Sequence, residues 1–184
     1  MIIQKSNRYF CSQCQLLFLK IIEMTDLELQ KRDLLSETQR CAELFNSQIF
    51  TNHQLFTQSA FIEILVRLNY ILQELSKKNN RIIWADDVQT DQNIKDITDL
   101  VNNLRNATCH SDSPRNYISN SNIKFVFNTF AGKCPNAVKI GENVSLGNEY
   151  QDDIAFYYGD KRIYLVRHIK RLLEELPNEI NKLK

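Results

Sequence analysis

The sequence has few of the two residues that most often break regular structure. Glycine occurs 4 times and proline 3 times among 184 residues. This scarcity argues against a glycine-rich phosphate-binding loop and against an all-β fold with many tight turns. A strong charge bias is also missing, since the formal net charge is +1. Any contact with nucleic acid must therefore come from a local basic patch, because the field of the whole molecule is weak.

Long hydrophobic runs are missing as well. The longest run near the start, Leu16 to Leu19, ends at Lys20, and no stretch approaches the length that crosses a bilayer. No small-residue cleavage site follows, so we interpret residues 1–24 as an N-terminal extension and not as a signal peptide. We expect no contact with a membrane.

Cysteine use indicates a reducing compartment. Cys41, Cys109 and Cys134 stand alone within or beside apolar patterns, as unpaired thiols do. Cys11 and Cys14 form a C-x-x-C pair, but no second ligand pair follows, so we interpret this pair as incidental. The chain is therefore expected to be cytoplasmic and to bind no metal or other cofactor.

Hydrophobic periodicity predicts four long helices. The first begins at Thr25, because Thr25 and Glu28 have the spacing of a capping box. The other three are expected from near Asn52 to Lys77–Asn80, from near Thr90 to Pro114, and from about Lys161 to Leu176, where Pro177 interrupts the last one.

Between the third and last helices the pattern changes. The stretches IKFVFNTF, at 123–130, and DIAFYYG, at 153–159, are rich in β-branched and aromatic residues, which is typical of strands. We therefore predict a mainly α fold over residues 25–184. It is a bundle of four to five helices with a small β-rich insertion at about 121–160, before the last helix.

The third helix carries a polar group without an acid among its members. In the stretch NNLRNATCHSDSP no acidic residue lies between Asn102 and His110. On a helical wheel, Asn102, Arg105, Asn106 and His110 fan across the side opposite the apolar stripe. Asn102, Asn106 and His110 are successive i, i+4 neighbours. The group is thus predicted to face away from the chain's own core, as a surface suited to an anion.

These residue types suit cleavage of RNA without a metal. His110 can take or give a proton near neutral pH, and Arg105 offers a permanent planar charge that matches phosphate oxygens. We therefore expect Arg105, Asn106 and His110 to be catalytic and Asn102 to bind RNA. The alternative is a solvated helix end, at which the helix dipole favours His110.

One histidine does not complete a reaction that moves two protons. If two copies of this helix face each other across a twofold axis, the shared site contains two arginines and two histidines. We therefore expect a homodimer.

A second set of basic residues occurs on the last helix. Arg167, His168, Lys170 and Arg171 are predicted to lie on its solvent side. There Arg167, Lys170 and Arg171 are expected to contact the phosphate backbone of RNA. The alternative is a solvated face whose charges are balanced by the glutamates that follow.

The hexapeptide RNATCH, Arg105 to His110, resembles the signature of the HEPN superfamily. The signature has an arginine, a polar residue and a histidine a few positions later, late in a long helix, and Arg105, Asn106 and His110 match it by position. The resemblance extends over about 25–176 and is specific at this motif. It implies a HEPN-like helical bundle that dimerises through the motif helices. It also implies metal-independent endoribonuclease activity, which many members of the superfamily have, often as toxins or phage-defence effectors.

The resemblance also suggests partners, namely an antitoxin or a nucleotidyltransferase. Some toxin members carry a tyrosine two residues after the histidine, which a partner nucleotidyltransferase modifies. In this chain Asp112 stands there, and the nearest tyrosine is Tyr117.

Two other functions fit the same residues. One is a non-catalytic HEPN-like dimer that binds RNA, a nucleotide or a partner protein through this face. The other is the inhibited subunit of a toxin–antitoxin pair. The intact Arg–Asn–His set favours RNA cleavage, because a pure scaffold does not require a titratable group there.

Overall fold

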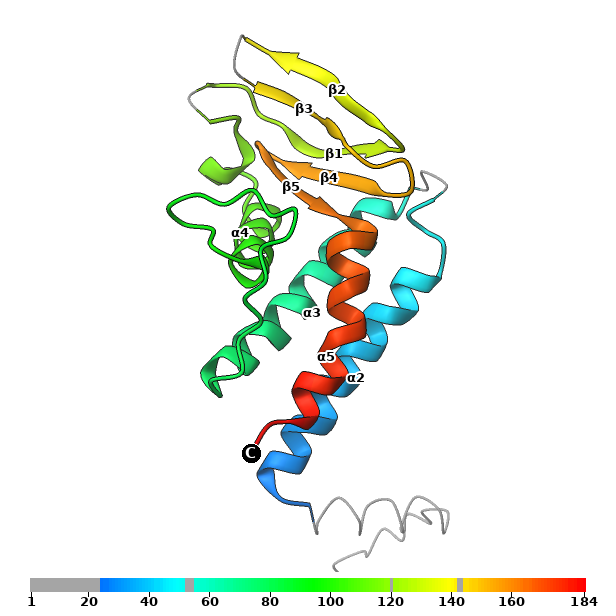
Figure 1. Ribbon diagram of the computed structural model, residues 1–184, viewed down its shortest axis with the longest axis vertical. Coiled ribbons are helices and arrows are strands. Elements are labelled where there is room, and N and C mark those ends of the chain that lie inside the picture. The colour runs from blue at the N-terminus through cyan, green and yellow to red at the C-terminus, as the bar shows by residue number, and fades with distance from the viewer. Residues whose placement is uncertain (1–23, 52–54, 120, 142–143) are drawn as a thin grey trace, which may run out of the picture.

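Long helices and a small β-layer share the chain, as the computed structural model shows (Figure 1). It describes residues 24–51, 55–119, 121–141 and 144–184, so the expected extension at 1–24 lies almost entirely outside the described residues. The α-helices are α2 (Asp26–Asn46), α3 (Thr57–Lys77), α4 (Ile97–Cys109) and α5 (Arg171–Asn181). The strands are β1 (Val126–Ala131), β2 (Cys134–Ile140), β3 (Val144–Asn148), β4 (Ile154–Tyr158) and β5 (Lys161–Tyr164). Two short helical segments complete the list, η1 (Pro114–Asn116) and η2 (Leu165–Lys170).

The predicted fold class, a mainly α HEPN-like bundle with a β-rich insertion, is wrong. The chain is an α/β mixture, 48% helix and 19% strand, with two small antiparallel sheets. The sheet that contains β4 and β5 contributes to the main core, because Phe156, Tyr158 and Ile163 are buried in the same cluster as the α3 side chains. Phe61 of α3 stacks on Phe156 with 4.4 Å between ring centroids. Since the sheet completes the core that the helices begin, it is an integral layer.

The β-layer consists of two antiparallel pairings. One sheet has the order β1-β4-β5, and β2 pairs with β3 in a hairpin. The Tyr157 hydroxyl joins the two sheets, since it donates to the Gly147 carbonyl at 2.7 Å and accepts from the Gly147 N–H at 3.1 Å. A Cβ at Gly147 would stand 2.0 Å from the Cys134 carbonyl oxygen, so the close approach of β2 and β3 requires glycine there.

The start of the first helix is confirmed. The Thr25 hydroxyl accepts from the Glu28 N–H at 3.2 Å, and the Glu28 carboxylate accepts from the Thr25 N–H at 2.7 Å. This reciprocal capping box satisfies N–H groups that have no partner within α2.

The expected starts of the second and third helices are too early. Residues 52–54 lie outside the described residues, and α3 begins at Thr57. The third helix begins at Ile97, because the Asp96 carboxylate accepts from the Asp99 N–H at 2.9 Å and caps it. Before that, Asp91 accepts from two backbone N–H groups and holds a non-helical turn. Ile94 is nevertheless buried. Its apolar side chain therefore fitted the helical pattern of the sequence, although the residue precedes the helix.

The last helix differs from its prediction at both ends. Residues 161–164 pair with β4 as β5, and helical structure begins at Leu165 with a π-helical turn. The buried Asp153 carboxylate caps that turn by accepting from the N–H groups of Val166 at 2.8 Å and Arg167 at 3.0 Å. Pro177 lies inside α5, which continues to Asn181, so the predicted interruption is wrong.

The described helices include none that is both long and apolar enough to cross a membrane.

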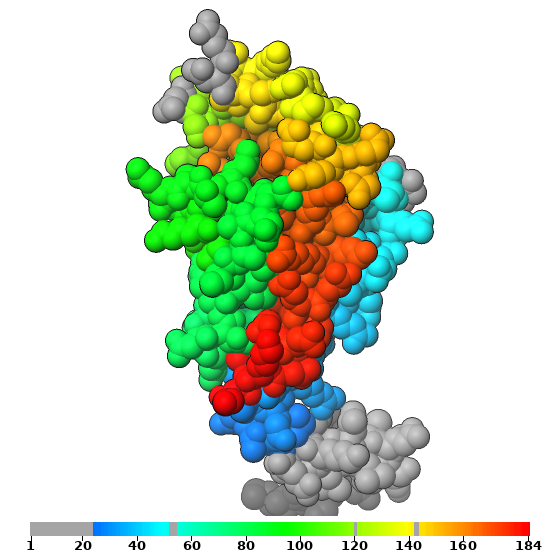
Figure 2. Space-filling model, viewed as in Figure 1, coloured from blue at the N-terminus to red at the C-terminus, as the bar shows by residue number. Residues whose placement is uncertain are grey.

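Figure 2 shows the segment after α3, in green, packed against α5, in orange and red. Trp84 makes two of the contacts between them, since its Nε1 donates to Glu175 at 2.8 Å and the Arg171 guanidinium lies 4.0 Å from its ring centroid.

Candidate functional site

The motif helix α4 is held by its buried face and by its first turn. The predicted apolar stripe is confirmed, since it is buried at Ile97, Leu100, Val101, Leu104 and Ala107. At the N-terminus, Arg81 donates to Asp96 at 2.8 Å and to Asp99 at 2.6 Å. The opposite face, which carries the motif, is consequently turned away from the core on a helix that is anchored before the motif begins.

Three side chains of this face form a hydrogen-bonded series that we call the amide row, consisting of Arg105, Asn106 and Asn102. Arg105 Nη1 donates to Asn106 Oδ1 at 3.1 Å, and Asn106 Nδ2 donates to Asn102 Oδ1 at 3.4 Å. The series runs from a cation to the Asn102 amide, whose NH₂ has no partner among the described residues. A row of this polarity presents N–H donors, and these suit an anionic oxygen.

Arg105 has no carboxylate partner within the described residues, where five of the nine arginines form ion pairs. Arg67, Arg81, Arg167 and Arg171 each form ion pairs with acidic side chains. Arg105 is half-buried, and the one hydrogen bond that its side chain forms with a described residue is to an amide oxygen. Its Nε is buried without a partner in that part of the chain. A guanidinium in this state retains most of its capacity to bind an anion.

His110 does not continue the row. The helix ends at Cys109, and His110 has an extended backbone with φ −131° and ψ 105°. Its carbonyl accepts from the Ser113 N–H at 3.0 Å and from Asn116 Nδ2 at 2.8 Å. These bonds turn the chain, so the expected i, i+4 relation of His110 to Asn106 is absent. The imidazole is exposed and makes no hydrogen bond to the described residues.

The structure places His168 in the interior, contrary to the predicted solvent position. It is fully buried, and its Nδ1 accepts from the Tyr164 N–H at 3.2 Å. Nδ1 must therefore be unprotonated, and Nε2 donates to the Asp86 carbonyl, 3.1 Å away. Burial lowers the pKa of His168 to about 4. His168 is a structural histidine that is neutral at physiological pH.

The basic residues of the last helix that were expected to bind RNA form ion pairs with acidic residues. Arg167 donates to Asp152 at 3.2 Å and to Asp153 at 3.1 Å, and its guanidinium lies 3.4 Å from the Tyr150 ring centroid. Arg171 pairs with Asp86 and Glu175, both at 2.9 Å, and Lys170 is 3.8 Å from Glu174. None of these contacts reaches α4, so the structure does not join Arg167, Lys170 and Arg171 to the amide row.

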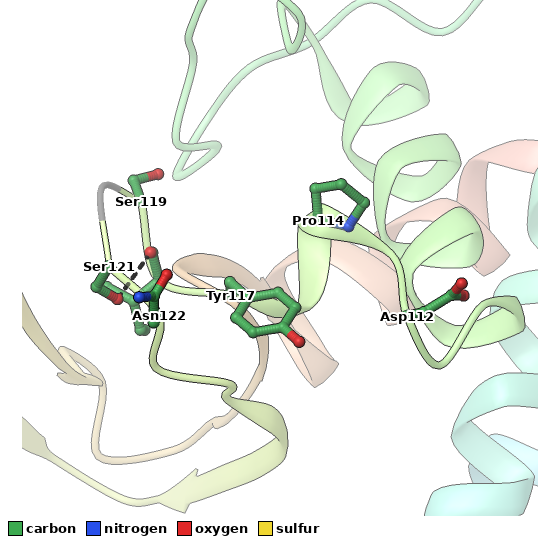
Figure 3. Close-up of a pocket in the computed structure, with 7 residues that line it drawn as sticks. Asp112, Pro114, Tyr117, Ser119, Ser121 and Asn122 are labelled. Carbon is green, nitrogen blue, oxygen red and sulfur yellow. Dashed lines mark hydrogen bonds between the residues drawn. The ribbon is translucent and has the colours of Figure 1, made fainter.

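Two hollows beside the motif helix were not predicted from the sequence. One, of about 650 Å³, is lined by Asn102 and Asn103 of α4 together with Arg115, Tyr117 and Lys161. The other, of about 680 Å³, lies on the loop after α4, and Figure 3 shows Tyr117 between Pro114 and Asn122 along it. Both share Pro114, Tyr117 and Ser119. The signal in the sequence was the run PRNY, Pro114 to Tyr117, which begins four residues after His110.

No group of three or more histidine, cysteine, aspartate or glutamate side chains within the described ranges has the arrangement of a metal site. Comparisons with protein-family models, curated proteins and solved structures found no match. The side chains of the α4 face themselves are therefore the basis for inferring its chemistry.

Proposed function

We propose that the chain is a metal-independent endoribonuclease whose site is the α4 face. The observation that carries the proposal is Arg105, a half-buried guanidinium without a carboxylate partner among the described residues, which begins an amide row that ends in the NH₂ donors of Asn102. The likeness of Arg105, Asn106 and His110 to the HEPN signature supports the same reaction. It concerns the motif alone, since the fold departs from the expected bundle.

The reaction assigns one task to each residue type. One His110 takes the proton of a ribose 2′-OH, and the O2′ atom attacks the adjacent phosphorus. Arg105 stabilises the charge on the phosphorane oxygens, with the Asn106 and Asn102 amides as neighbouring donors. A second imidazole gives a proton to the 5′-oxygen as the P–O5′ bond breaks. The products are a 2′,3′-cyclic phosphate and a 5′-OH end.

A second copy of the chain supplies the second imidazole. Within the described residues the only other histidine is His168, and both of its ring nitrogens are engaged in the interior. A twofold dimer through the α4 faces brings two copies of Arg105 and His110 together. By analogy with the motif's family, the proposed role is that of a cytoplasmic toxin or phage-defence effector that is controlled by an antitoxin or a nucleotidyltransferase.

The test is incubation of the purified chain with mixed RNAs in EDTA. We expect cleavage to persist and to leave 2′,3′-cyclic phosphate or 3′-phosphate ends with 5′-OH. His110→Ala should lower the single-turnover rate by about 10² to 10⁴, the usual contribution of general acid–base catalysis. Arg40→Ala is the control, because Arg40 is an exposed residue of α2 whose hydrogen bond is to Glu37.

The position of His110 favours a second function, which is binding without cleavage. Its ring lies off the amide row and forms no hydrogen bond with the described residues. The same face then binds RNA, a nucleotide or a partner protein without cleaving it. If the parent chain binds RNA but does not cleave it, the catalytic proposal is wrong and this binding function replaces it. If the parent chain cleaves RNA and His110→Ala, with an unchanged melt, cleaves equally fast, His110 is not the catalytic base.

A further inference from the structure

The hollow of about 650 Å³ beside α4, which we call the Tyr117 hollow, adjoins the proposed site. Asn102 belongs both to the amide row and to the lining of this hollow. Asn103, the next residue, lines it as well. A ligand whose anionic group lies on the amide row therefore extends into the Tyr117 hollow without leaving α4.

The charges of the lining disfavour a second phosphate deep in this hollow. Three aspartates line it, and cations hold them, since Asp99 accepts from Arg81 at 2.6 Å and Asp91 from Lys161 at 2.8 Å. Asp160 lies 3.6 Å from the same Lys161. The hollow is thus polar with little net charge, and it suits an uncharged polar group better than a polyanion.

Arg115 is the exception in this lining. It is exposed and forms no ion pair within the described residues. At the rim of the hollow it offers a free cation to a phosphate that flanks the group bound inside.

Tyr117 gives the hollow an aromatic wall with a fixed backbone. Its N–H donates to the Pro114 carbonyl at 3.2 Å, and it forms a bridge with Lys124. Next to it, Ile118 N–H donates to the Ile123 carbonyl at 2.9 Å. The half-buried Tyr117 ring is consequently presented by a loop that is tied on both sides, and Figure 3 shows the ring in the middle of that loop.

We propose that the Tyr117 hollow binds one unstacked nucleobase of the RNA, next to the phosphate that lies on the amide row. The base stacks on Tyr117, the amides of Asn102 and Asn103 contact its polar edge, and Arg115 contacts the flanking phosphate. The placement of the scissile phosphate rests on the proposed function. The substrate is accordingly single-stranded RNA, a loop or a bulge, because a base within a duplex cannot leave its stack without loss of pairing.

Binding is measured apart from cleavage. The probe is a fluorescein-labelled single-stranded 2′-O-methyl RNA, which lacks the attacking hydroxyl, and the readout is fluorescence anisotropy. Tyr117→Ala should weaken binding by about 5- to 150-fold, the usual contribution of one stacked base. Tyr117→Phe and Tyr117→Trp should bind within about threefold of the parent chain, since each keeps an aromatic face. The same sequence as a duplex should bind the parent chain much more weakly.

A control variant and a comparison with cleavage separate this proposal from loss of fold and from failure of the proposed function. Tyr70→Ala removes an exposed tyrosine that donates to Asp33 on the α2–α3 side of the molecule, and should leave binding unchanged. If the parent chain never cleaves RNA but Tyr117→Ala still loses affinity, the endoribonuclease proposal fails and the base site stands. If Tyr117→Ala, with an unchanged melt, binds the single strand like the parent chain, or if the duplex binds equally well, the base site is wrong.

Discussion

At the scale of the residue, the feature that decides the site is the state of the Arg105 side chain. Five of the nine arginines among the described residues form ion pairs with acids, and Arg81 thereby joins the loop before α4 to its first turn. Arg105 contacts an amide instead. Its charge is therefore available to a ligand, and a variant that removes it tests the chemistry with little effect on the fold.

Arg105→Ala should lower the cleavage rate by about 10² to 10³, as removal of a donor to a developing oxyanion does in other enzymes. Arg105→Lys should restore little, because a point charge does not reproduce the planar fork that bonds to Asn106 and to phosphate together. The free energy of unfolding should change by less than about 1 kcal/mol, since no ion pair is lost. The measurements are single-turnover cleavage and a denaturant melt of each variant.

Asn106→Ala provides the graded comparison. It breaks the amide row between Arg105 and Asn102 but leaves the guanidinium, so its rate should fall less than that of Arg105→Ala. Equal losses in both variants would mean that the row acts as one unit and that Arg105 does not act by its charge alone.

At the scale of the element, the last helix depends on a buried neutral histidine at its start. His168 accepts from the β5 backbone and donates to the loop that contains Asp86, so it joins three segments at the point where β5 becomes helix. Burial lowers its pKa to about 4, whereas an exposed histidine in the unfolded chain has a pKa of about 6.5.

The pH dependence of stability follows from that difference. Between about pH 6.5 and pH 4 the unfolded chain binds a proton at His168 that the folded chain does not, so stability falls as the pH falls through this window. The loss should approach about 3 kcal/mol for this group, at about 1.4 kcal/mol per pH unit. Denaturant melts at intervals of half a pH unit measure it. His168→Gln should be less stable at neutral pH but should lose this slope.

Acidic groups do not reproduce that window. The pKa of Asp86 is held below its usual value by Arg171, and the pKa of Asp91 is lowered chiefly by Lys161. Their contribution to stability is present above about pH 4 and is lost below it. A slope that persists unchanged between pH 6.5 and 4 in His168→Gln would show that His168 is not the group responsible.

The elements also show which parts of the fold local sequence can predict. The capping box at Thr25 and the apolar stripe of α4 are formed by residues within a few positions of each other, and both are confirmed. The strand β5 was missed because residues 161–164 become a strand through pairing with β4, in which Tyr164 lies opposite Ala155. Periodicity within the segment itself does not contain that information.

The site divides in the same way. The Arg105–Asn106–Asn102 series follows from helical spacing and is found in the structure. The departure of His110 was not predicted, because it depends on a side chain six residues later, Asn116, which captures the His110 carbonyl. The occupied state of Arg167 was not predicted either, because its acidic partners come from the β3–β4 connection.

At the scale of the whole molecule, the proposed reaction needs a second imidazole that the α4 face of one chain does not supply from the described residues. α4 lies toward one edge of the ribbon, and α2, α3 and α5 run together beside it (Figure 1). Asn102 and His110 of the motif face are exposed, so we expect this face to be accessible to a second copy. A twofold contact there would place the missing imidazole against the amide row.

Activity should therefore depend on chain concentration. We expect analytical ultracentrifugation to show a dimer, and cleavage per chain to fall on dilution over the same range in which the dimer dissociates. The Arg40→Ala control should follow the curve of the parent chain. Cleavage per chain that stays constant while the sedimenting species becomes a monomer would show that one chain is sufficient.

The hydrogen bonds around the turn after α4 have a further consequence for the kinetics of RNA association. The carbonyls of His110 and Ser111 are held by Ser113, Asn116 and Lys124, and Asn116 is almost fully buried. These hydrogen bonds tie the imidazole-bearing turn to Asn116 and Lys124, which lie on either side of Tyr117, so we expect the turn and Tyr117 to keep their relative position when a ligand binds. A preformed surface binds without rearrangement of its backbone, so stopped-flow association with the 2′-O-methyl RNA should follow a single exponential whose rate rises linearly with RNA concentration.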